Sequence, residues 1–117
     1  MTKELIVERL RAWVRAGAVP RELSATDFHE DFSYDDGIDR VQPPLAADHA
    51  RMTDGRLEEL AVLAEVVTPD SYVAVARGRE DVTGLWHQRA WVFFFRQGRI
   101  HRLERRSGRF GRQIDHL

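Results

Sequence analysis

The spacing of apolar residues predicts a helix at the start of the chain. Four large apolar side chains recur at i, i+4, i+7 and i+8, the period of one helix face: Ile6, Leu10, Trp13 and Val14. Thr2 is suited to cap this helix, and Gly17 and Pro20 end it. Pro20 is then expected to begin a short second helical turn through Leu23.

The next stretch mixes aromatic and acidic residues, which predicts a short strand. The segment FHEDFSYDDG has aromatic residues at positions 28, 32 and 34, and Gly37 is placed to turn the chain. After Pro43-Pro44 a short helix is expected near residues 46–52, and Asp54-Gly55 is expected to stop it.

From Leu57 onward the chain contains near-continuous apolar runs. The segment LEELAVLAEVV, residues 57–67, fits either a helical or an extended period. We favour a strand, because the following TPDS segment, residues 68–71, has Pro at the second position of a type I turn. Residues 72–79 are rich in β-formers, so the two runs are expected to form a hairpin.

The strongest strand signal is LWHQRAWVFFFR, residues 85–96. Gln97-Gly98 separates it from RIHRLERR, residues 99–106, and a tight X-Gly connection is a hairpin signal. Helices followed by a four-strand antiparallel meander predict an α+β domain with the helices packed on one sheet face. No repeat, Pro-rich linker or low-complexity segment occurs, so residues 1–117 are taken as one domain.

Composition excludes several classes of protein. The 117 residues contain no Cys, which excludes thiol catalysis and Cys-based zinc sites. No apolar run approaches the roughly 18 residues of a membrane span, and charges interrupt the N-terminal apolar stretch. We therefore expect a soluble, cytoplasmic protein without a membrane anchor. The five His residues show no HxH or HExxH spacing, and GxSxG, GxGxxG and P-loop motifs are absent, so no metal or other cofactor is expected.

The net charge of -1 conceals an uneven distribution. Residues 1–81 contain ten basic and seventeen acidic residues, a charge of -7, whereas residues 82–117 contain eight basic and two acidic residues, a charge of +6. This division predicts ion pairs between the acidic first part of the chain and the basic last part, with Arg89 lying against the acidic strand. The segment RLERRSGRFGR, residues 102–112, could form a basic arm for nucleic acid, but a solvated tail that balances the acidic half accounts for it better. Nucleic acid is not an expected partner.

Five segments together carry a family resemblance. They are the helix ending RAWVRAG, the strand FHEDFSYDD, the hairpin EVVTPDSYVAVARGRE, the DVTG turn and WVFFFRQGRIHRLERR. They resemble the nuclear transport factor 2-like superfamily, and within it the SnoaL-like polyketide cyclase and ketosteroid isomerase branch. The resemblance covers nearly the whole chain. It implies a cone-shaped α+β fold, in which a curved sheet wraps over helices and encloses a pocket, and often a homodimer through the outer sheet face.

Alternation along the aromatic strand assigns its residues to two faces. The resemblance places His87 and Arg89 on the concave face, which would line a pocket for a small hydrophobic molecule. The expected substrate contacts are Trp13, Tyr34, Trp91 and Phe93. The convex face carries an apolar row suited to a homodimer: Ala90, Val92 and Phe94. The alternative is that both faces are simply buried.

The acidic strand offers a candidate general base. Alignment with the isomerase segment places Asp36 at the family's base position, with Tyr34 on the same strand face. Desolvation in an apolar pocket would raise the pKa of this carboxyl toward the range that suits proton abstraction, whereas pairing with Arg89 would lower the pKa. The segment Asp35-Asp36-Gly37 also fits an ordinary turn, in which Asp accepts backbone hydrogen bonds and Gly supplies a positive φ. Both interpretations stay open.

The chain departs from the isomerase pattern where that family stabilises an enolate. Leu10 stands at the position of the oxyanion-binding tyrosine, and Trp91 stands at that of the second carboxylic acid. Ketosteroid isomerisation is therefore unsupported, because oxyanion stabilisation supplies a large part of such catalysis. His87 and Arg89 offer a proton donor and a charge stabiliser in their place, although a strand-borne His is often structural.

The sequence thus predicts an isomerase-, cyclase- or lyase-type enzyme that applies acid-base catalysis to a hydrophobic carbonyl- or epoxide-containing molecule. Its catalytic candidates are Asp36, His87 and Arg89. The alternative is a non-catalytic ligand-binding or self-associating domain of the same fold. On the last strand His101 and Glu104 lie on opposite faces, so at most one of them can face the pocket, and the choice between them stays open.

Overall fold

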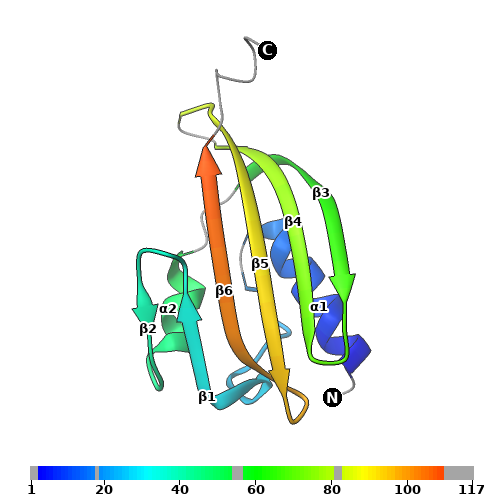
Figure 1. Cartoon of the computed structure of the whole chain (residues 1–117), viewed down its shortest axis with the longest axis vertical. Coiled ribbons are helices and arrows are strands. Elements are labelled where there is room, and N and C mark those ends of the chain that lie inside the picture. Colours follow the sequence, from blue (N-terminus) through cyan, green and yellow to red (C-terminus); the bar gives the residue numbers. More distant parts are fainter. Residues whose placement is uncertain (1–2, 18, 54–56, 81–82, 110–117) are drawn as a thin grey trace.

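The chain folds into one curved sheet with helices on one side (Figure 1). The structure is a computed structural model that describes residues 3–17, 19–53, 57–80 and 83–109. Its helical elements are α1 (Lys3–Ala16), the single 3-10 turn η1 (Ala25–Asp27) and α2 (Ala46–Thr53). Its strands are β1 (Phe28–Asp35), β2 (Arg40–Val41), β3 (Leu57–Val67), β4 (Ser71–Glu80), β5 (Trp86–Arg96) and β6 (Arg99–Arg109). The strand order is β2-β1-β6-β5-β4-β3.

The predicted antiparallel meander is confirmed in β3, β4, β5 and β6. Residues 57–67 form a strand and pair with β4, and the Thr68 N–H donates to the Ser71 carbonyl at 2.9 Å across the hairpin loop. Between β5 and β6 the Gln97-Gly98 pair has φ values of 53° and 73°. Positive φ at both central residues is the signature of a type I′ hairpin turn, which matches the twist of the flanking strands.

Two strand pairings go beyond the four-strand prediction. β1 lies parallel to β6, with Tyr34 opposite Leu103, and the two-residue β2 lies antiparallel to β1. β1 is the short strand predicted in FHEDFSYDDG, and together with β2 it extends the four-strand meander to six strands. The parallel pairing of β1 with β6 departs from the expected all-antiparallel sheet. The sequence pattern could not predict the β1–β6 pairing, because these two strands are about 70 residues apart in sequence.

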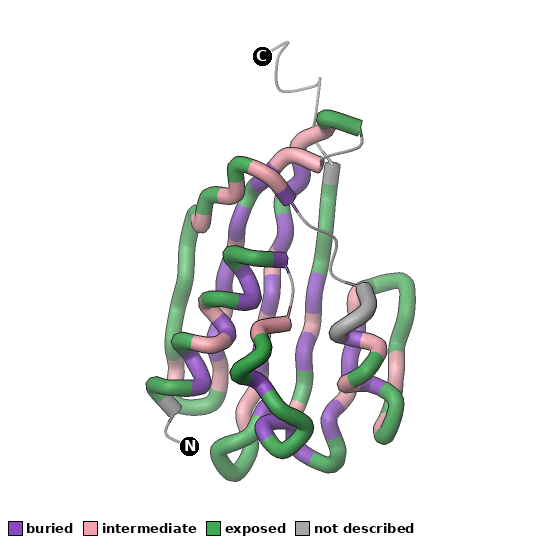
Figure 2. Tube along the Cα trace, turned by 180° about the vertical axis from the view of Figure 1, so that it is seen from behind, coloured by how far each residue is buried: buried purple, intermediate pink, exposed green. Residues whose placement is uncertain are grey.

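Both α-helices cover the same face of the sheet, as predicted (Figures 1 and 2). α1 packs against β3 and β4, and α2 packs against β1. α1 ends where expected, with the Gly17 N–H donating to the Trp13 carbonyl at 2.8 Å. The expected turn after Pro20 is a single turn closed by the Leu23 N–H, and the helix near 46–52 is α2. Thr2 and Asp54-Gly55 lie outside the described residues.

The core lies between the helices and the concave face of the sheet (Figure 2). Trp13 of α1 contacts Phe93 edge-on, with ring centroids 5.2 Å apart, and contacts Phe28 at 6.5 Å. On the inward face, Trp91 of β5 is paired with the small Ala74 of β4, and Phe93 is paired with Tyr72. The α+β class with a curved sheet on helices is confirmed.

Among the described residues, no helix is both long enough and apolar enough to cross a bilayer.

Candidate functional site

The inward face of β5 carries the predicted polar candidates. His87, Arg89, Trp91 and Phe93 are all buried, whereas the residues between them are half-buried or exposed. This alternation places His87 and Arg89 on the concave face, as expected. His87 lies near the start of β5, at the end of the sheet that extends beyond α1 and α2 (Figure 1).

A carboxylate lies against the His87 imidazole. Nε2 of His87 is hydrogen-bonded to Glu80 Oε2, and the two side chains are 10% and 24% exposed. The β4–β5 hairpin produces this contact, because the Glu80 N–H donates to the Leu85 carbonyl at 2.8 Å and closes the loop. His87 is paired with Gly78, so the next inward position on β4 is Glu80. The result is a carboxylate–imidazole pair in which the imidazole is buried and the carboxylate is half-buried.

Two arginines extend the polar part of the concave face. Arg89 lies two residues beyond His87 on β5, and Arg105 lies on β6 directly opposite Trp91. Both arginines are 8% exposed. An Arg guanidinium stays protonated at all accessible pH values, so this region has a fixed positive charge next to the imidazole.

The four residues predicted to contact substrate belong to the packed core. Trp13, Tyr34, Trp91 and Phe93 expose at most 1% of their surface. Three clefts lined by described residues have volumes of about 350, 260 and 190 Å³, and of these four side chains Tyr34 alone borders one of them. These four aromatic side chains therefore lie inside the core that the helices and the sheet enclose.

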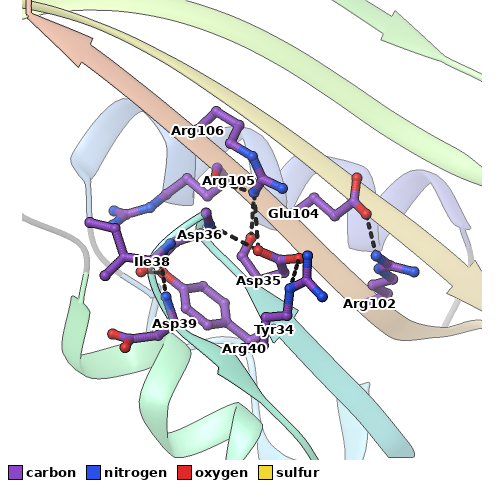
Figure 3. Close-up of polar contacts among 11 residues, drawn as sticks. Tyr34, Asp35, Asp36, Ile38, Asp39, Arg40, Arg102, Glu104, Arg105 and Arg106 are labelled. Carbon is purple, nitrogen blue, oxygen red and sulfur yellow. Dashed lines mark hydrogen bonds and ion pairs between the residues drawn. The ribbon is translucent and has the colours of Figure 1, made fainter.

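Asp36 adopts the turn geometry that the sequence left open (Figure 3). Its Oδ1 accepts the N–H groups of Ile38 at 2.9 Å and Asp39 at 2.7 Å, and its Oδ2 accepts the Tyr34 hydroxyl at 3.0 Å. Gly37 has a φ of 88°. Burial raises the pKa of Asp36, but the hydrogen bonds and the charge of Arg105 together lower it below the ordinary value. Of the two interpretations left open, these contacts and the lowered pKa favour the ordinary turn.

The acidic strand pairs with arginines of the basic half, as the charge distribution predicted, but through β6 (Figure 3). Arg106 lies 3.4 Å from the Asp35 carboxylate, and Arg40 lies 3.3 Å from it on the other side. The Gly37 N–H donates to Asp35 at 2.8 Å and lowers the Asp35 pKa, and the nearby arginines lower it further against the effect of burial. Arg106 and Arg40 make these contacts with Asp35, and the expected position of Arg89 against the acidic strand stays a prediction.

The strand register separates Asp36 from the other two catalytic candidates. Extended by one residue past its last pair, the β1–β6 ladder sets Asp36 beside Arg105, which is paired with Trp91. With strands about 4.8 Å apart and about 3.3 Å per residue, the Cα of Asp36 is about 12 Å from that of Arg89 and about 16 Å from that of His87. The structure brings together Asp36 with Tyr34, and His87 with Arg89, as two separate groups.

The two open candidates on β6 lie away from the carboxylate–imidazole pair. Glu104 is paired with the convex residue Val92 and contacts Arg102. His101 contacts His29 edge-on at 5.4 Å, in the irregular part of β6 near the β5–β6 turn. Burial lowers the pKa of His101, and Arg96 and His29 lower it further.

Sequence reasoning missed Glu80 and Arg105. Glu80 could have been found from the hairpin register, because an acid and a His that flank a short loop at equivalent inward positions face each other. To predict Arg105, one must know which residues of β6 point inward. An irregularity in the β5–β6 ladder shifts the pairing of the two strands by one residue and so changes that assignment.

Comparisons with known proteins establish the fold and leave the family open. No protein-family model matches the chain, and no curated protein matches its sequence. A de novo designed protein with a curved β-sheet is similar, with a TM-score of 0.69 and 15% identity over 92% of this chain and 88% of that chain. A Rhodopseudomonas palustris protein named "Putative Isomerase" is similar, with a TM-score of 0.65 and 18% identity over 92% of this chain and 91% of that chain.

A further match is an NTF-2 like protein of unknown function from Silicibacter pomeroyi DSS-3, with a TM-score of 0.41 and 15% identity over 92% of this chain and 100% of that chain. That superposition is too loose to argue from. The first two likenesses, at identities below one fifth, show the curved α+β fold alone.

Proposed function

We propose that this protein is an acid-base catalyst of the isomerase or cyclase type, a member of the SnoaL-like branch of the nuclear transport factor 2-like superfamily. The observation that carries the proposal is the buried contact between His87 Nε2 and Glu80 on the concave face, with Arg89 on the same face. The resemblance of the sequence motifs and the named isomerase of the same fold support it.

The carboxylate–imidazole pair suits proton transfer. A neutral imidazole that donates its Nε2–H to Glu80 has its lone pair on Nδ1, so Nδ1 is the atom that would accept a proton from a substrate. The Glu80 carboxylate then stabilises the imidazolium that forms, and it holds the ring in one orientation. Returning the same proton to a different carbon or oxygen completes an isomerisation or a ring closure.

The arginines replace the enolate-stabilising pair that the sequence lacks. Proton removal next to a carbonyl creates negative charge on oxygen, and a fixed positive group in a water-poor site stabilises that charge. Arg89 occupies this position relative to His87. The buried Trp91 indole N–H, which has no hydrogen-bond partner among the described residues, is a second donor at the position where the family has a carboxylic acid.

The substrate class follows from these groups. A small hydrophobic molecule with a carbonyl or an epoxide offers both an oxygen for the arginine and a weakly acidic C–H or ring oxygen for the imidazole. The apolar core beneath the polar row favours a largely apolar body. Asp36 is not the base in this proposal, because its hydrogen bonds and lowered pKa make it a weak base. Its side chain orders the turn instead.

A deuterium-exchange assay tests the proposal. Model β,γ-unsaturated and cyclic ketones in deuterated water are followed by proton NMR, and the protein is expected to accelerate exchange of the acidic C–H. His87→Gln should lower the exchange rate by about 100-fold or more, the usual contribution of a general base. Gln88→Ala is the matched control, because Gln88 is the exposed neighbour on the opposite face. Equal rates in His87→Gln and the unchanged protein would favour the non-catalytic ligand-binding alternative.

We also propose a homodimer through the convex sheet face. Three apolar residues of β5 are half-buried there in a single chain: Ala90, Val92 and Phe94. A second copy would cover this row, and the expected result in light scattering is twice the mass of one chain. Phe94→Glu should return the protein to a monomer, and a monomeric unchanged protein would contradict the proposal.

A further inference from the structure

A second group of chemically active side chains lies on the far side of β1 from the carboxylate–imidazole pair. One ligand atom from each of Asp36, Asp39 and His49 lies within 4.8 Å of the other two. Asp36 and Asp39 belong to the turn between β1 and β2, and His49 belongs to α2. No sequence motif indicates this group, because the distance between the acids and the histidine depends on how α2 packs against β1.

The His49 imidazole presents its Nε2 to the acidic turn between β1 and β2. This Nε2 is buried and has no hydrogen-bond partner in the described ranges, and it lies within ion-pair distance of Asp39 Oδ2, at 3.5 Å. The His49 backbone N–H donates to the Leu45 carbonyl at 3.0 Å, and the Tyr34 ring packs against the imidazole at 5.2 Å.

Asp36 also keeps one acceptor position. A carboxylate has about four lone-pair sites. Two backbone N–H groups occupy Oδ1, and the Tyr34 hydroxyl occupies one site on Oδ2. One lone pair of Oδ2 is therefore left for a further ligand, and the other three contacts orient the carboxylate as outer-shell hydrogen bonds orient metal ligands.

We propose that Asp36, Asp39 and His49 form a binding site for a divalent transition-metal ion. One imidazole nitrogen and two carboxylate oxygens are a ligand set that suits Zn²⁺, Co²⁺ or Mn²⁺ better than Ca²⁺ or Mg²⁺, which prefer oxygen ligands alone. Ligands on such an ion lie roughly 3 to 3.5 Å apart, given bond lengths of about 2.0–2.2 Å. Asp39 is 54% exposed, so its side chain can close the remaining distance.

The arrangement leaves coordination positions open. Three protein ligands occupy three of the four to six positions that these ions use, so water or an anionic ligand would complete the shell. The site is separate from the His87–Glu80 pair, because Asp36 is two strands away from β5. Metal binding can therefore be present when the proposed catalysis fails, and the reverse also holds.

The test is a metal titration of the full-length, untagged protein after chelator treatment. Binding of Zn²⁺ is measured by calorimetry, and Co²⁺ is followed through its visible d–d absorption, which reports coordination geometry. We expect one ion per chain. His49→Gln and Asp39→Asn should each weaken binding by more than about tenfold, because loss of an outer-shell partner alone typically costs about 10–100-fold. Tyr34→Phe, which removes one outer-shell hydrogen bond to Asp36, should weaken it by about tenfold.

Asp48→Asn is the matched control, since Asp48 is the exposed acid next to His49 on α2 and lies outside the group. It should bind with unchanged affinity. Circular dichroism of each variant verifies the fold, and both ligand residues are exposed enough to be replaced without loss of the core. Absence of binding at one ion per chain, or unchanged affinity in both His49→Gln and Asp39→Asn, would overturn the proposal.

Discussion

Gly78→Ala tests how closely β3 packs against β4. A Cβ added at Gly78 would lie 2.7 Å from the Cβ of Leu57 and 3.2 Å from the carbonyl oxygen of Glu58. The Leu57 Cβ is fixed to its backbone, so rotation of the side chain cannot relieve the contact and β3 must move. Overpacking of this kind costs about 1–3 kcal/mol. The reduced freedom of the unfolded chain offsets about 0.4–1 kcal/mol, so we expect a net loss of about 1–2 kcal/mol.

Urea denaturation measures this loss as a shift of the unfolding midpoint at unchanged slope. Gly108→Ala is the control, because a Cβ at Gly108 meets nothing within 4 Å. That variant should be as stable as the unchanged protein, or more stable by about 0.4–1 kcal/mol. If Gly78→Ala matched Gly108→Ala in stability, the close approach of β3 and β4 at this position would be refuted.

Two further predictions concern the core and the edge of the sheet. Trp13→Ala should lower the free energy of unfolding, measured by urea denaturation, by about 3–5 kcal/mol, because it removes a fully buried ring that contacts Phe28 and Phe93. Arg15→Ala, at an exposed position of the same helix, should change the free energy of unfolding by less than about 0.5 kcal/mol. The Glu65 carboxylate accepts hydrogen bonds from Arg11 at 3.0 Å and from the Tyr72 hydroxyl at 2.8 Å, and these contacts lower the pKa of Glu65. A carboxyl group whose pKa is lowered in the folded state stabilises the fold at pH values above its ordinary pKa of 4.5, and this stabilisation is lost as the pH falls through the folded-state pKa. Glu65→Gln should therefore be less stable than the unchanged protein at pH 7 by up to about 1 kcal/mol. The difference in stability should shrink below pH 4.5. A difference that stayed constant from pH 7 to pH 3 would contradict this linkage, and Glu22→Gln, at an exposed position, should show no such trend.

Local signals were sufficient for most of the secondary structure. The ambiguous apolar run at 57–67 is a strand because a turn and a second β-rich run follow it at once, and the hairpin decides between the two periods. The Gln97-Gly98 turn was equally local. The parallel pairing of β1 with β6 and the short β2 could not be predicted this way, because no pattern within either segment identifies a partner far along the chain.

The candidate site also has features that local sequence patterns predict and features that depend on tertiary structure. The inward position of His87 and Arg89 followed from strand alternation. The lowered pKa of Asp36 could not be predicted in this way, because it depends on whether hydrogen-bond donors or apolar atoms surround the carboxylate. The turn supplies two N–H donors, and the Tyr34 hydroxyl of β1 is a third. The contact of Glu80 with His87 depends on the register of a hairpin, and the contact of His49 with Asp39 depends on how α2 packs on the sheet.

The pairing of β1 with β6 has a consequence for synthesis of the chain. Among the described strands, β1 and β2 contact the rest of the sheet through β6, so during translation the pair that they form with each other has no further sheet partner until β6 has been made. A ribosome-bound chain ending before Arg99 could build the β3–β5 hairpins but would leave the β1 edge exposed. β6 thus joins two parts of one sheet, so the complete six-stranded sheet can form only once β6 is available.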